Sequence, residues 1–443
     1  MKTFVLRAIR KTSHVTKHAG MRGVNFLGKV ENKATFLLNS GVLQDSVKVD
    51  DIFYSKYPHL TPVYPALPKL GQKPSVTIFG FLHPAGFYGG IATLLFVGAK
   101  LANELGYDLR VVQTTGYSDK VDPVEFLNKN GIEMTYDRYS TINLSNRSQY
   151  DYGYLPLHPD DVVLVSAWWD ARIASQLPLK NKFVYLIQDF EPIFYNNSDA
   201  YTLADETYHS EKFIPVTNTE ILLDYFKKNN YNYVAKNATF FEPAPSPAVK
   251  KRRFKASKTK KIFLYGRPNV DRNMFYTAIM ALDKALSDPR LDEYSIELYS
   301  AGSADVPNIQ LSSGVKIINK GKMSLDEYYS FAQTIDVAIS PMLAPHPNYP
   351  TLEFSSIGAT VVTTKWETKA NLDRYSKNIF MSEPTIDDMA EKIIAAITKP
   401  INEVEADVAH NNLNTDWNSS LDEPIRKIAQ KLQSSKTRKK TRA

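Results

Sequence analysis

The chain has 443 residues, of which 43% are hydrophobic and 23% charged, and it contains no cysteine. This composition is ordinary for a soluble globular protein, and the length predicts two domains of roughly 200 residues each. The lack of cysteine excludes disulfides, thiolate metal sites and cysteine nucleophiles, and it fits a cytoplasmic protein. No apolar run approaches the roughly 20 residues that cross a bilayer, and the basic N-terminus does not resemble a signal peptide.

The net charge of +7 is distributed unevenly along the chain. Residues 1–33, 250–261 and 424–443 each hold eight Lys or Arg, and together they contain a single acid, Glu31. The rest of the chain is therefore acidic, which argues against a nucleic-acid groove across the folded domains. We expect the basic segments either to remain solvated or to attach the protein to an anionic membrane surface.

Residues 1–70 give weak signals and are interpreted as an N-terminal extension packed on the first domain. Residues 71–245 predict an N-terminal Rossmann-like domain, because apolar runs alternate with helical stretches, as in a parallel sheet. The expected strands are Ser75–Phe81, Leu109–Gln113, Val162–Ser166 and Phe183–Ile187.

A glycine pair, Gly89 and Gly90, follows the first of these strands in the segment HPAGFYGG. The missing side chains permit either a close approach of backbone to a ligand or a tight helix entry. The glycines are not spaced as a dinucleotide fingerprint, so the motif alone is weak.

Aromatic and polar side chains gather where the last two strands end, in SAWWDAR and IQDFEP. Such side chains suit a sugar, whose apolar face stacks on aromatics while its hydroxyls need hydrogen-bond partners. The alternative is a buried Trp with carboxylates that cap helices. The candidate acceptor-binding residues are His83, Trp168, Asp170, Gln188, Asp189 and Glu191. We assign no metal, since the acidic pair lacks further oxygen ligands and the histidines lack zinc spacing.

The strongest domain boundary is EPAPSPAVKKRRFKASKTKK, which begins at Glu242. Residues 246–260 are interpreted as a basic, Pro-rich linker, residues 261–415 as a C-terminal Rossmann-like domain, and residues 416–443 as a C-terminal helix with a basic tail. Strands are expected at Lys261–Gly266, in SIELYSAG and VKIINKG, and at Ile335–Ser340 and Ala359–Thr364.

Residues 335–364 are the most informative stretch. Two apolar, β-branched runs flank a proline-rich loop and a short helix that is expected to begin at Pro350 and end before Gly358. In an open α/β sheet, free N–H groups at such a helix start face the ligand crevice and suit a nucleotide diphosphate. The side chains expected there are those of Tyr349, Thr351 and Glu353.

Two basic residues follow other strands of the same predicted sheet: Arg267 in YGRP and Lys322 in NKGKM. The carboxyl ends of parallel strands share one edge, so both side chains should converge on the same crevice. A guanidinium fork and a flexible ammonium are the expected ligands of phosphate.

The segments SPM, HPNYPTLEF, GATVVTT, YGRP, NKGKMSLDEYY and QDFEP resemble those of GT-B glycosyltransferases of the family 4 type. The resemblance is greatest to the bacterial rhamnosyltransferases related to rhamnan-synthesis protein F. It implies two Rossmann-like domains whose parallel sheets face an interdomain cleft, with the acceptor on the first and the nucleotide sugar on the second. It also implies that Glu353 holds the ribose, that Arg267 and Lys322 hold the diphosphate, and that Gly89 and Gly90 let backbone approach the donor phosphates and the acceptor. The family's first acidic position falls on Pro345, which leaves Tyr349 and His346 to shape the sugar pocket.

This resemblance leads us to expect a retaining, metal-independent and cofactor-free enzyme with Arg267, Lys322 and Tyr349 as catalytic residues. It would move L-rhamnose from dTDP-L-rhamnose to a growing cell-surface polysaccharide on the cytoplasmic side, where the acceptor would be carried on a membrane lipid. An inverting route would need a general base, for which Asp170, Asp189 and His83 are candidates. A nucleotide-sugar epimerase and a non-catalytic glycan-binding partner of a polysaccharide synthase are the alternative functions.

The C-terminal segment IRKIAQKLQSSKTRKKTRA has Ile425, Ile428 and Leu432 along one helical face and basic residues elsewhere. This pattern predicts a helix that lies either on a membrane or on the first domain.

Overall fold

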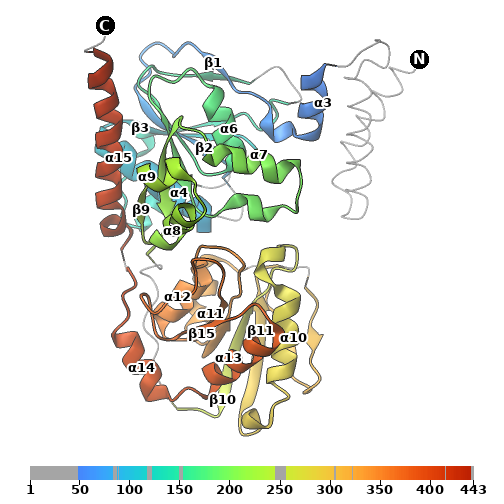
Figure 1. Ribbon diagram of the computed structural model, residues 1–443. Helices are drawn as coiled ribbons and strands as arrows, with labels where there is room; N and C mark the ends of the chain where they lie inside the picture. Colours follow the sequence, from blue (N-terminus) through green and yellow to red (C-terminus); the bar gives the residue numbers. More distant parts are fainter. Residues whose placement is uncertain are drawn as a thin grey trace.

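The computed structural model describes residues 48–82, 87, 89–116, 122–148, 153–244, 256–303, 306–321, 323–414 and 416–440. These residues form two seven-stranded sheets and one two-stranded sheet. Each large sheet belongs to its own domain, and Figure 1 shows one domain above the other. The expected α/β fold of two Rossmann-like domains is confirmed.

The sheet of the first domain has the strand order β4-β3-β2-β6-β7-β8-β9, with parallel neighbours throughout. Its strand order reverses between β2 and β6, so a ligand crevice is expected where these strands end. The strands are β2 (Ser75–Gly80), β3 (Asp108–Gln113), β4 (Tyr139–Asn143), β6 (Val162–Val165), β7 (Phe183–Ile187), β8 (Phe213–Asn218) and β9 (Thr239–Phe241). The helices are α4 (Gly89–Leu105), α5 (Pro123–Lys129), α6 (Trp168–Gln176), α7 (Asp199–Tyr208), α8 (Glu220–Lys228) and α9 (Asn232–Asn237).

The sheet of the second domain has the order β12-β13-β11-β10-β14-β15-β16, in which only the edge strand β12 is antiparallel to its neighbour. Here the order reverses between β10 and β14. The strands are β10 (Thr259–Tyr265), β11 (Ser295–Ala301), β12 (Ile309–Gln310), β13 (Lys316–Asn319), β14 (Val337–Ile339), β15 (Thr360–Thr364) and β16 (Ile379–Ser382). The helices are α10 (Phe275–Ala285), α11 (Leu325–Ala332), α12 (Tyr349–Ile357), α13 (Ile386–Thr398) and α14 (Ile401–Ala409).

The central strands form because their residues are apolar or β-branched on both faces. Every residue of β7, FVYLI, and of β15, TVVTT, is buried. Strands of this composition need helices on both sides, and βα connections supply them. Because the strands themselves are apolar, polar groups lie in the loops at the carboxyl ends of the strands.

The first described residues cover one side of the first domain. They comprise α3 (Val49–Lys56), a 3-10 turn at Pro58–Leu60, and β1 (Tyr64–Ala66), which pairs with β5 (Tyr154–Pro156). Leu60 is buried against Trp168 of α6. The part of the expected extension that the structure describes thus packs on the first domain.

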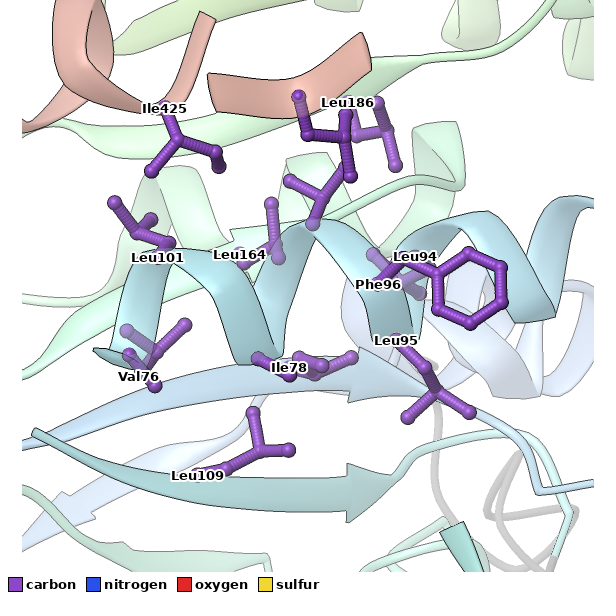
Figure 2. Packing of buried hydrophobic residues seen from close by; sticks show 14 of the residues in the cluster. Val76, Ile78, Leu94, Leu95, Phe96, Leu101, Leu109, Leu164, Leu186 and Ile425 are labelled. Atoms are coloured by element: carbon purple, nitrogen blue, oxygen red, sulfur yellow. The ribbon is translucent and has the colours of Figure 1, made fainter. Parts of the chain in front are cut away.

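The last helix, α15 (Trp417–Lys440), returns from the second domain and lies along the first (Figure 1). Its residues Ile425, Ile428 and Leu432 are 2%, 0% and 2% exposed and join the core that surrounds α4. Figure 2 shows Ile425 in the same cluster as Leu101 of α4. This apolar face therefore belongs to the fold: of the two expected placements, the structure has the one on the first domain, and the face is not available to a membrane. Among the described residues, no helix is both long and apolar enough to cross a bilayer.

Candidate active site

Tyr349, the first residue of α12, joins the two domains. Its hydroxyl oxygen lies 2.7 Å from Thr93 Oγ1 of α4 and accepts a hydrogen bond from Asn218 Nδ2 of β8 at 2.8 Å. Burial raises the pKa of the phenol to about 12, so it stays protonated. The side chain expected to be catalytic is thus engaged with the first domain, where it holds the two carboxyl edges together.

The expected glycine pair lies beside this contact at the start of α4. Gly89 has φ +49°, and a Cβ there would lie 3.9 Å from the Tyr349 ring. Gly90 accepts a hydrogen bond at its carbonyl from Gln188 Nε2 (2.9 Å), and a Cβ on Gly90 would approach that side chain to 3.1 Å. The pair therefore allows the α4 entry to come close to residues of both domains.

Arg267 follows β10, as expected from YGRP. Its Nη1 donates to the Tyr265 hydroxyl at 3.4 Å, and no carboxylate lies within ion-pair distance in the part of the chain that the structure describes. Arg272, five residues later, has its Nε 3.7 Å from Asp189 Oδ2 of the first domain. Burial and the nearby Arg267 lower the pKa of Arg272, whereas Asp189 raises it. Asp189 therefore faces Arg272 alone, and the guanidinium of Arg267 has no carboxylate partner among the described residues.

Lys322, expected beside Arg267, lies outside the described residues. The preceding Gly321 accepts a hydrogen bond from the Gly302 N–H at 3.2 Å. Gly302 has φ +121°, and a Cβ there would meet Arg267 Cγ at 3.1 Å. The loop after β11 thus lies next to Arg267, and the loop after β13 contacts the loop after β11 at Gly321.

The start of α12 is capped from within the chain. Asn348 Oδ1 accepts hydrogen bonds from the Thr351 N–H at 2.8 Å and from the Thr351 hydroxyl at 2.7 Å. Pro350, the second residue of the helix, has no N–H. The expectation of several free N–H groups here is therefore wrong, and Thr351, which is 0% exposed, serves the cap rather than an open ligand site.

Glu353 lies one turn further along α12 and is partly buried. Its Oε2 accepts a hydrogen bond from the Tyr328 hydroxyl at 2.8 Å. Burial raises the pKa of Glu353 to about 7, because no cation among the described residues offsets its charge. This carboxyl group retains acceptor capacity for a ligand hydroxyl.

Two of the residues expected to bind an acceptor lie in the interior instead. Trp168 is 0% exposed. Its backbone N–H donates a hydrogen bond to Glu191 Oε2 at 2.6 Å, and its indole N–H donates one to the Tyr195 hydroxyl at 2.8 Å. Asp170 is 2% exposed and accepts a hydrogen bond from the Thr114 hydroxyl at 2.8 Å. Burial raises the pKa of Asp170 to about 6. Both expectations are corrected, because both side chains are buried and hydrogen-bonded within the first domain, Trp168 to Tyr195 and Asp170 to Thr114.

Asp189 reaches the second domain through Arg272, whereas the hydrogen bonds of Gln188 lie within the first domain. Gln188 Nε2 donates to Ser166 Oγ at 2.7 Å as well as to Gly90, while its Oε1 has no hydrogen-bond partner. Asp189 is 7% exposed, and burial raises its pKa to about 6. Glu191 Oε2 accepts the hydrogen bond from the Trp168 backbone N–H, and burial raises the pKa of Glu191 to about 8. His83 lies outside the described residues.

Three residues at this interface were missed or little used in the sequence interpretation: Arg272, His346 and Lys369. Arg272 carried a signal, since it is a second basic residue in the loop that follows β10. Lys369 carried none, because only the tertiary fold brings its Nζ within 2.7 Å of the Met342 carbonyl. It is 0% exposed, and burial lowers its pKa to about 7.

Buried polar atoms without a hydrogen-bond partner among the described residues occur in both domains, and besides Trp169 Nε1 of α6 they include atoms of these residues. In native proteins nearly all buried polar groups are paired, so such a group of exceptions marks a ligand site. The atoms are Gln188 Oε1, Thr217 Oγ1, Asn218 Oδ1, Arg272 Nε, Asn273 Oδ1, Ser300 Oγ and His346 Nε2. No cluster of three or more His, Asp or Glu suited to a metal ion occurs in the described ranges.

Comparison with known proteins gives matches in both domains. Residues 78–220 match the family described as "WsaF, N-terminal domain", and residues 260–394 match "WsaF, C-terminal domain". The O-antigen biosynthesis protein RfbC of Myxococcus xanthus is 26% identical over 265 residues. That alignment covers 59% of this chain but only 20% of RfbC.

Several solved structures share the fold. HepE of Anabaena, in complex with UDP and glucose, superposes with a TM-score of 0.54 at 15% identity, covering 81% of this chain and 100% of HepE. WaaG, a glycosyltransferase involved in lipopolysaccharide biosynthesis, gives a TM-score of 0.53 at 13% identity, covering 79% and 98%. A trehalose-phosphate synthase (UDP-forming) of Burkholderia xenovorans gives a TM-score of 0.52 at 12% identity, covering 80% and 99%.

Proposed function

This chain belongs to the WsaF family and has the GT-B fold, and on that premise we propose that it is a glycosyltransferase of cell-surface polysaccharide biosynthesis. Its donor is a nucleoside-diphosphate sugar, and we propose dTDP-L-rhamnose as that donor. The nucleotide binds the second domain at the ends of β10 and β14, and the acceptor binds the first domain at the ends of β2, β6 and β7. At β2 and β6, and at β10 and β14, the strand order of each sheet reverses. The segment after β7 contains Gln188, whose Oε1 has no hydrogen-bond partner among the described residues.

The observation that carries the proposal is the guanidinium pair at the domain interface. Arg267 has no carboxylate partner among the described residues, and Arg272 has only a distant one in Asp189. An incompletely neutralised pair of arginines fits a diphosphate, which presents several oxygens to two forks. A glycan alone carries no such charge.

Glycosyl transfer from a nucleotide sugar passes through an oxocarbenium-like state while negative charge collects on the leaving diphosphate. Arg267 and Arg272, with Lys322, stabilise that charge, which is the largest electrostatic demand of the reaction. Glu353 accepts a hydrogen bond from a ribose hydroxyl. Tyr349 keeps the domains together through Thr93 and Asn218 rather than acting as an acid or base.

The stereochemical course proposed is retention without a metal ion. The acceptor hydroxyl forms its bond to the anomeric carbon on the face from which the phosphate departs, and its proton passes to the departing phosphate oxygen. An inverting enzyme would instead need a base on the opposite face. Of the candidates Asp170, Asp189 and His83, we favour Asp189 for that role, because it pairs with Arg272 of the other domain.

The proposed acceptor is a growing glycan carried on a membrane lipid at the inner face of the cell membrane. The basic residues of the segments at 1–33 and 424–443 support this proposal through their charge. The apolar face of α15 does not contribute, because it is buried.

Thermal denaturation with dTDP, UDP and GDP tests the donor site. A ligand at 100 times its dissociation constant stabilises the folded state by about 2.7 kcal/mol. We expect dTDP to raise the melting temperature most, and Arg267→Ala to abolish the shift. Incubation with dTDP-L-rhamnose then separates transfer from epimerisation of the donor. No shift with any of the three nucleotides would exclude the glycosyltransferase function.

A further inference from the structure

The apolar side chains that stay exposed gather on the segment that precedes β2. Among the described residues, twelve large hydrophobic side chains are exposed, and six of these lie on that segment or on β5, which pairs with it. The six are Val49, Ile52, Tyr64, Leu67, Leu70 and Tyr154. Single exposed apolar residues are ordinary, whereas a group of them marks an interaction surface. The family matches begin at residue 78, so the segment itself lies outside them.

The loop at 67–73, between β1 and β2, presents two of these side chains most fully. Leu67 is 90% exposed and Leu70 is 107% exposed. A turn fixes the loop, because the Lys69 N–H donates to Gln72 Oε1 and the Gln72 N–H donates to the Lys69 carbonyl, both at 3.0 Å. The two leucines are therefore held in water by local structure, and their transfer to an apolar environment is favourable.

This loop lies at the edge of the first sheet where the parallel strands begin, opposite the carboxyl edge that contacts the second domain. It leads directly into β2, and Gln72 Nε2 donates to the carbonyl of Pro156, the last residue of β5, at 3.4 Å. The helix α15 reaches the same edge, since Leu432 and Gln433 line a small cavity with Val162, the first residue of β6. Figure 1 shows β1 and the C-terminal end of α15 at the end of the first domain that points away from the second.

Basic residues accompany the two leucines at this edge. Residues 67–73 and 431–443 together hold eight Lys or Arg and no acid. Lys69 and Lys73 are exposed, and neither forms an ion pair within the described ranges. The loop and the end of α15 therefore combine exposed apolar side chains with positive charge that no ion pair offsets in the loop.

We infer that this face of the first domain, which carries the 67–73 loop and the end of α15, binds an anionic lipid bilayer. Leu67 and Leu70 enter the headgroup region, while the Lys and Arg side chains contact lipid phosphates. Tyr64 and Tyr154 lie next to the loop with their ring centroids 5.9 Å apart, and tyrosine is favoured where a bilayer meets water. A soluble polyanion would leave the leucines in water, and a second copy of the chain would bring like charges together.

Such binding brings the enzyme to the membrane that carries its acceptor, and to that extent it rests on the proposed function. The six residues of β2 run from this face to the carboxyl edge, a length of roughly 20 Å. The reacting end of the acceptor therefore lies about that far from the bilayer, which suits a growing glycan better than a single lipid-linked sugar.

Sedimentation with vesicles measures the interaction. The vesicles contain phosphatidylglycerol and phosphatidylethanolamine in equal parts, and phosphatidylcholine vesicles are the comparison without net charge. The test variant is Leu67→Gln with Leu70→Gln. The control variant, Tyr276→Gln with Met280→Gln, changes two side chains of α10 that are 69% and 53% exposed. Both variants should keep the wild-type melting temperature, because all four side chains are exposed.

A fluorescent label shows which surface enters the bilayer. The chain has no cysteine, so Leu70→Cys and Met280→Cys each provide one labelling site. A label sensitive to polarity should shift to shorter wavelength with the anionic vesicles when it is attached at position 70, and it should not respond at position 280.

We expect the wild type to bind the anionic vesicles, to bind phosphatidylcholine vesicles far less, and to be released by high salt. The double leucine variant should bind the anionic vesicles weaker by about tenfold or more, and the control variant should match the wild type. No binding by the wild type, equal binding by the leucine variant, or equal responses of the two labels would overturn the inference. Self-association of the wild type without vesicles, lost in the leucine variant, would also overturn it, by assigning the surface to a second copy.

Transfer of sugar to a soluble glycan separates this inference from the proposed function. The wild type and the leucine variant should transfer at the same rate, because the substituted loop lies at the far edge of the sheet. Transfer without vesicle binding would refute the membrane surface and leave the proposed function intact. Vesicle binding without transfer would refute the proposed function and leave the membrane surface intact.

Discussion

At the scale of single residues, the chemistry depends on charges that the folded chain does not neutralise. Arg267 lacks a carboxylate partner among the described residues, Glu353 lacks a cation, and His346 lacks a hydrogen-bond partner at Nε2. Each has a counterpart on a nucleotide sugar: the diphosphate, a ribose hydroxyl and a sugar hydroxyl. Under the proposed function, a bound donor would supply these missing partners.

Arg267→Ala should raise the activation free energy for sugar transfer by about 2.7–4 kcal/mol, the range for removal of one preorganised donor to a developing charge. Steady-state release of nucleoside diphosphate measures it. Arg290→Ala is the control. Arg290 precedes β11, is exposed, and pairs with Asp288 and Glu391. Near-normal turnover in Arg267→Ala would mean that the diphosphate does not bind at this strand end.

Glu353→Gln should raise the donor KM more than it lowers kcat, because Gln keeps the shape and one acceptor. It should also change the pH dependence of stability. The pKa of Glu353 is raised from 4.5 to about 7 in the folded state, so its burial costs nothing below pH 4.5 and destabilises as pH rises through 7. Glu353→Gln should therefore melt at a higher temperature than the wild type at pH 8 and at nearly the same temperature at pH 4.5. A glycosyl adduct trapped on Glu353 would refute the ribose-binding role.

At the scale of elements, α15 behaves as part of the first domain although it follows the second in sequence. Ile428→Ala should cost about 2–5 kcal/mol of stability, as expected for truncation of a fully buried side chain. Thermal unfolding of this variant is compared with that of Lys427→Ala as the control, because the Lys427 side chain is exposed and pairs with Glu423. Equal melting temperatures would mean that α15 is detached from the core in solution.

Hydropathy was sufficient to predict the central strands. All nine expected strands are present; most are apolar runs buried on both faces, whereas β11 and β13 are partly exposed. The short edge strands β4, β9 and β16 were missed, since edge pairing leaves little pattern in three to five residues. β8 was also missed, and Pro215 within it disfavours a strand in sequence although the fold accommodates it opposite Tyr185.

The site was less predictable than the strands that carry it. Position at a strand end identified Arg267, Gln188 and Asp189 as candidate ligand-binding residues, and of these Asp189 has an ion pair with the other domain. It did not indicate that Trp168 and Asp170 turn into the core, because the orientation of a side chain after a strand depends on the following helix. Lys369 and the capped start of α12 follow from tertiary contacts with loops distant in the chain, for which no local pattern exists.

At the scale of the whole molecule, the two sheets meet through their carboxyl edges, and Tyr349 is a direct link between them. Tyr349→Phe removes the hydroxyl and leaves Asn218 Nδ2 without its partner. We expect a larger radius of gyration in small-angle scattering and a lower kcat, because the domains separate more easily. Tyr276→Phe, on the exposed face of α10, is the control. If scattering and turnover are unchanged in Tyr349→Phe, the Tyr349 hydroxyl is not needed to hold the two domains together.

The most direct measurement is the release of nucleoside diphosphate when purified protein is incubated with dTDP-L-rhamnose, UDP-glucose and a GDP-sugar, with and without a glycan acceptor. Glycosyl transfer at the arginine pair predicts acceptor-dependent release from one donor in the wild type, together with a product extended by one sugar. Arg267→Ala should reduce that release by two orders of magnitude or thereabouts, in line with about 2.7–4 kcal/mol of lost stabilisation. Release that is equal in the wild type and in Arg267→Ala, or a donor that is isomerised without transfer, would contradict it.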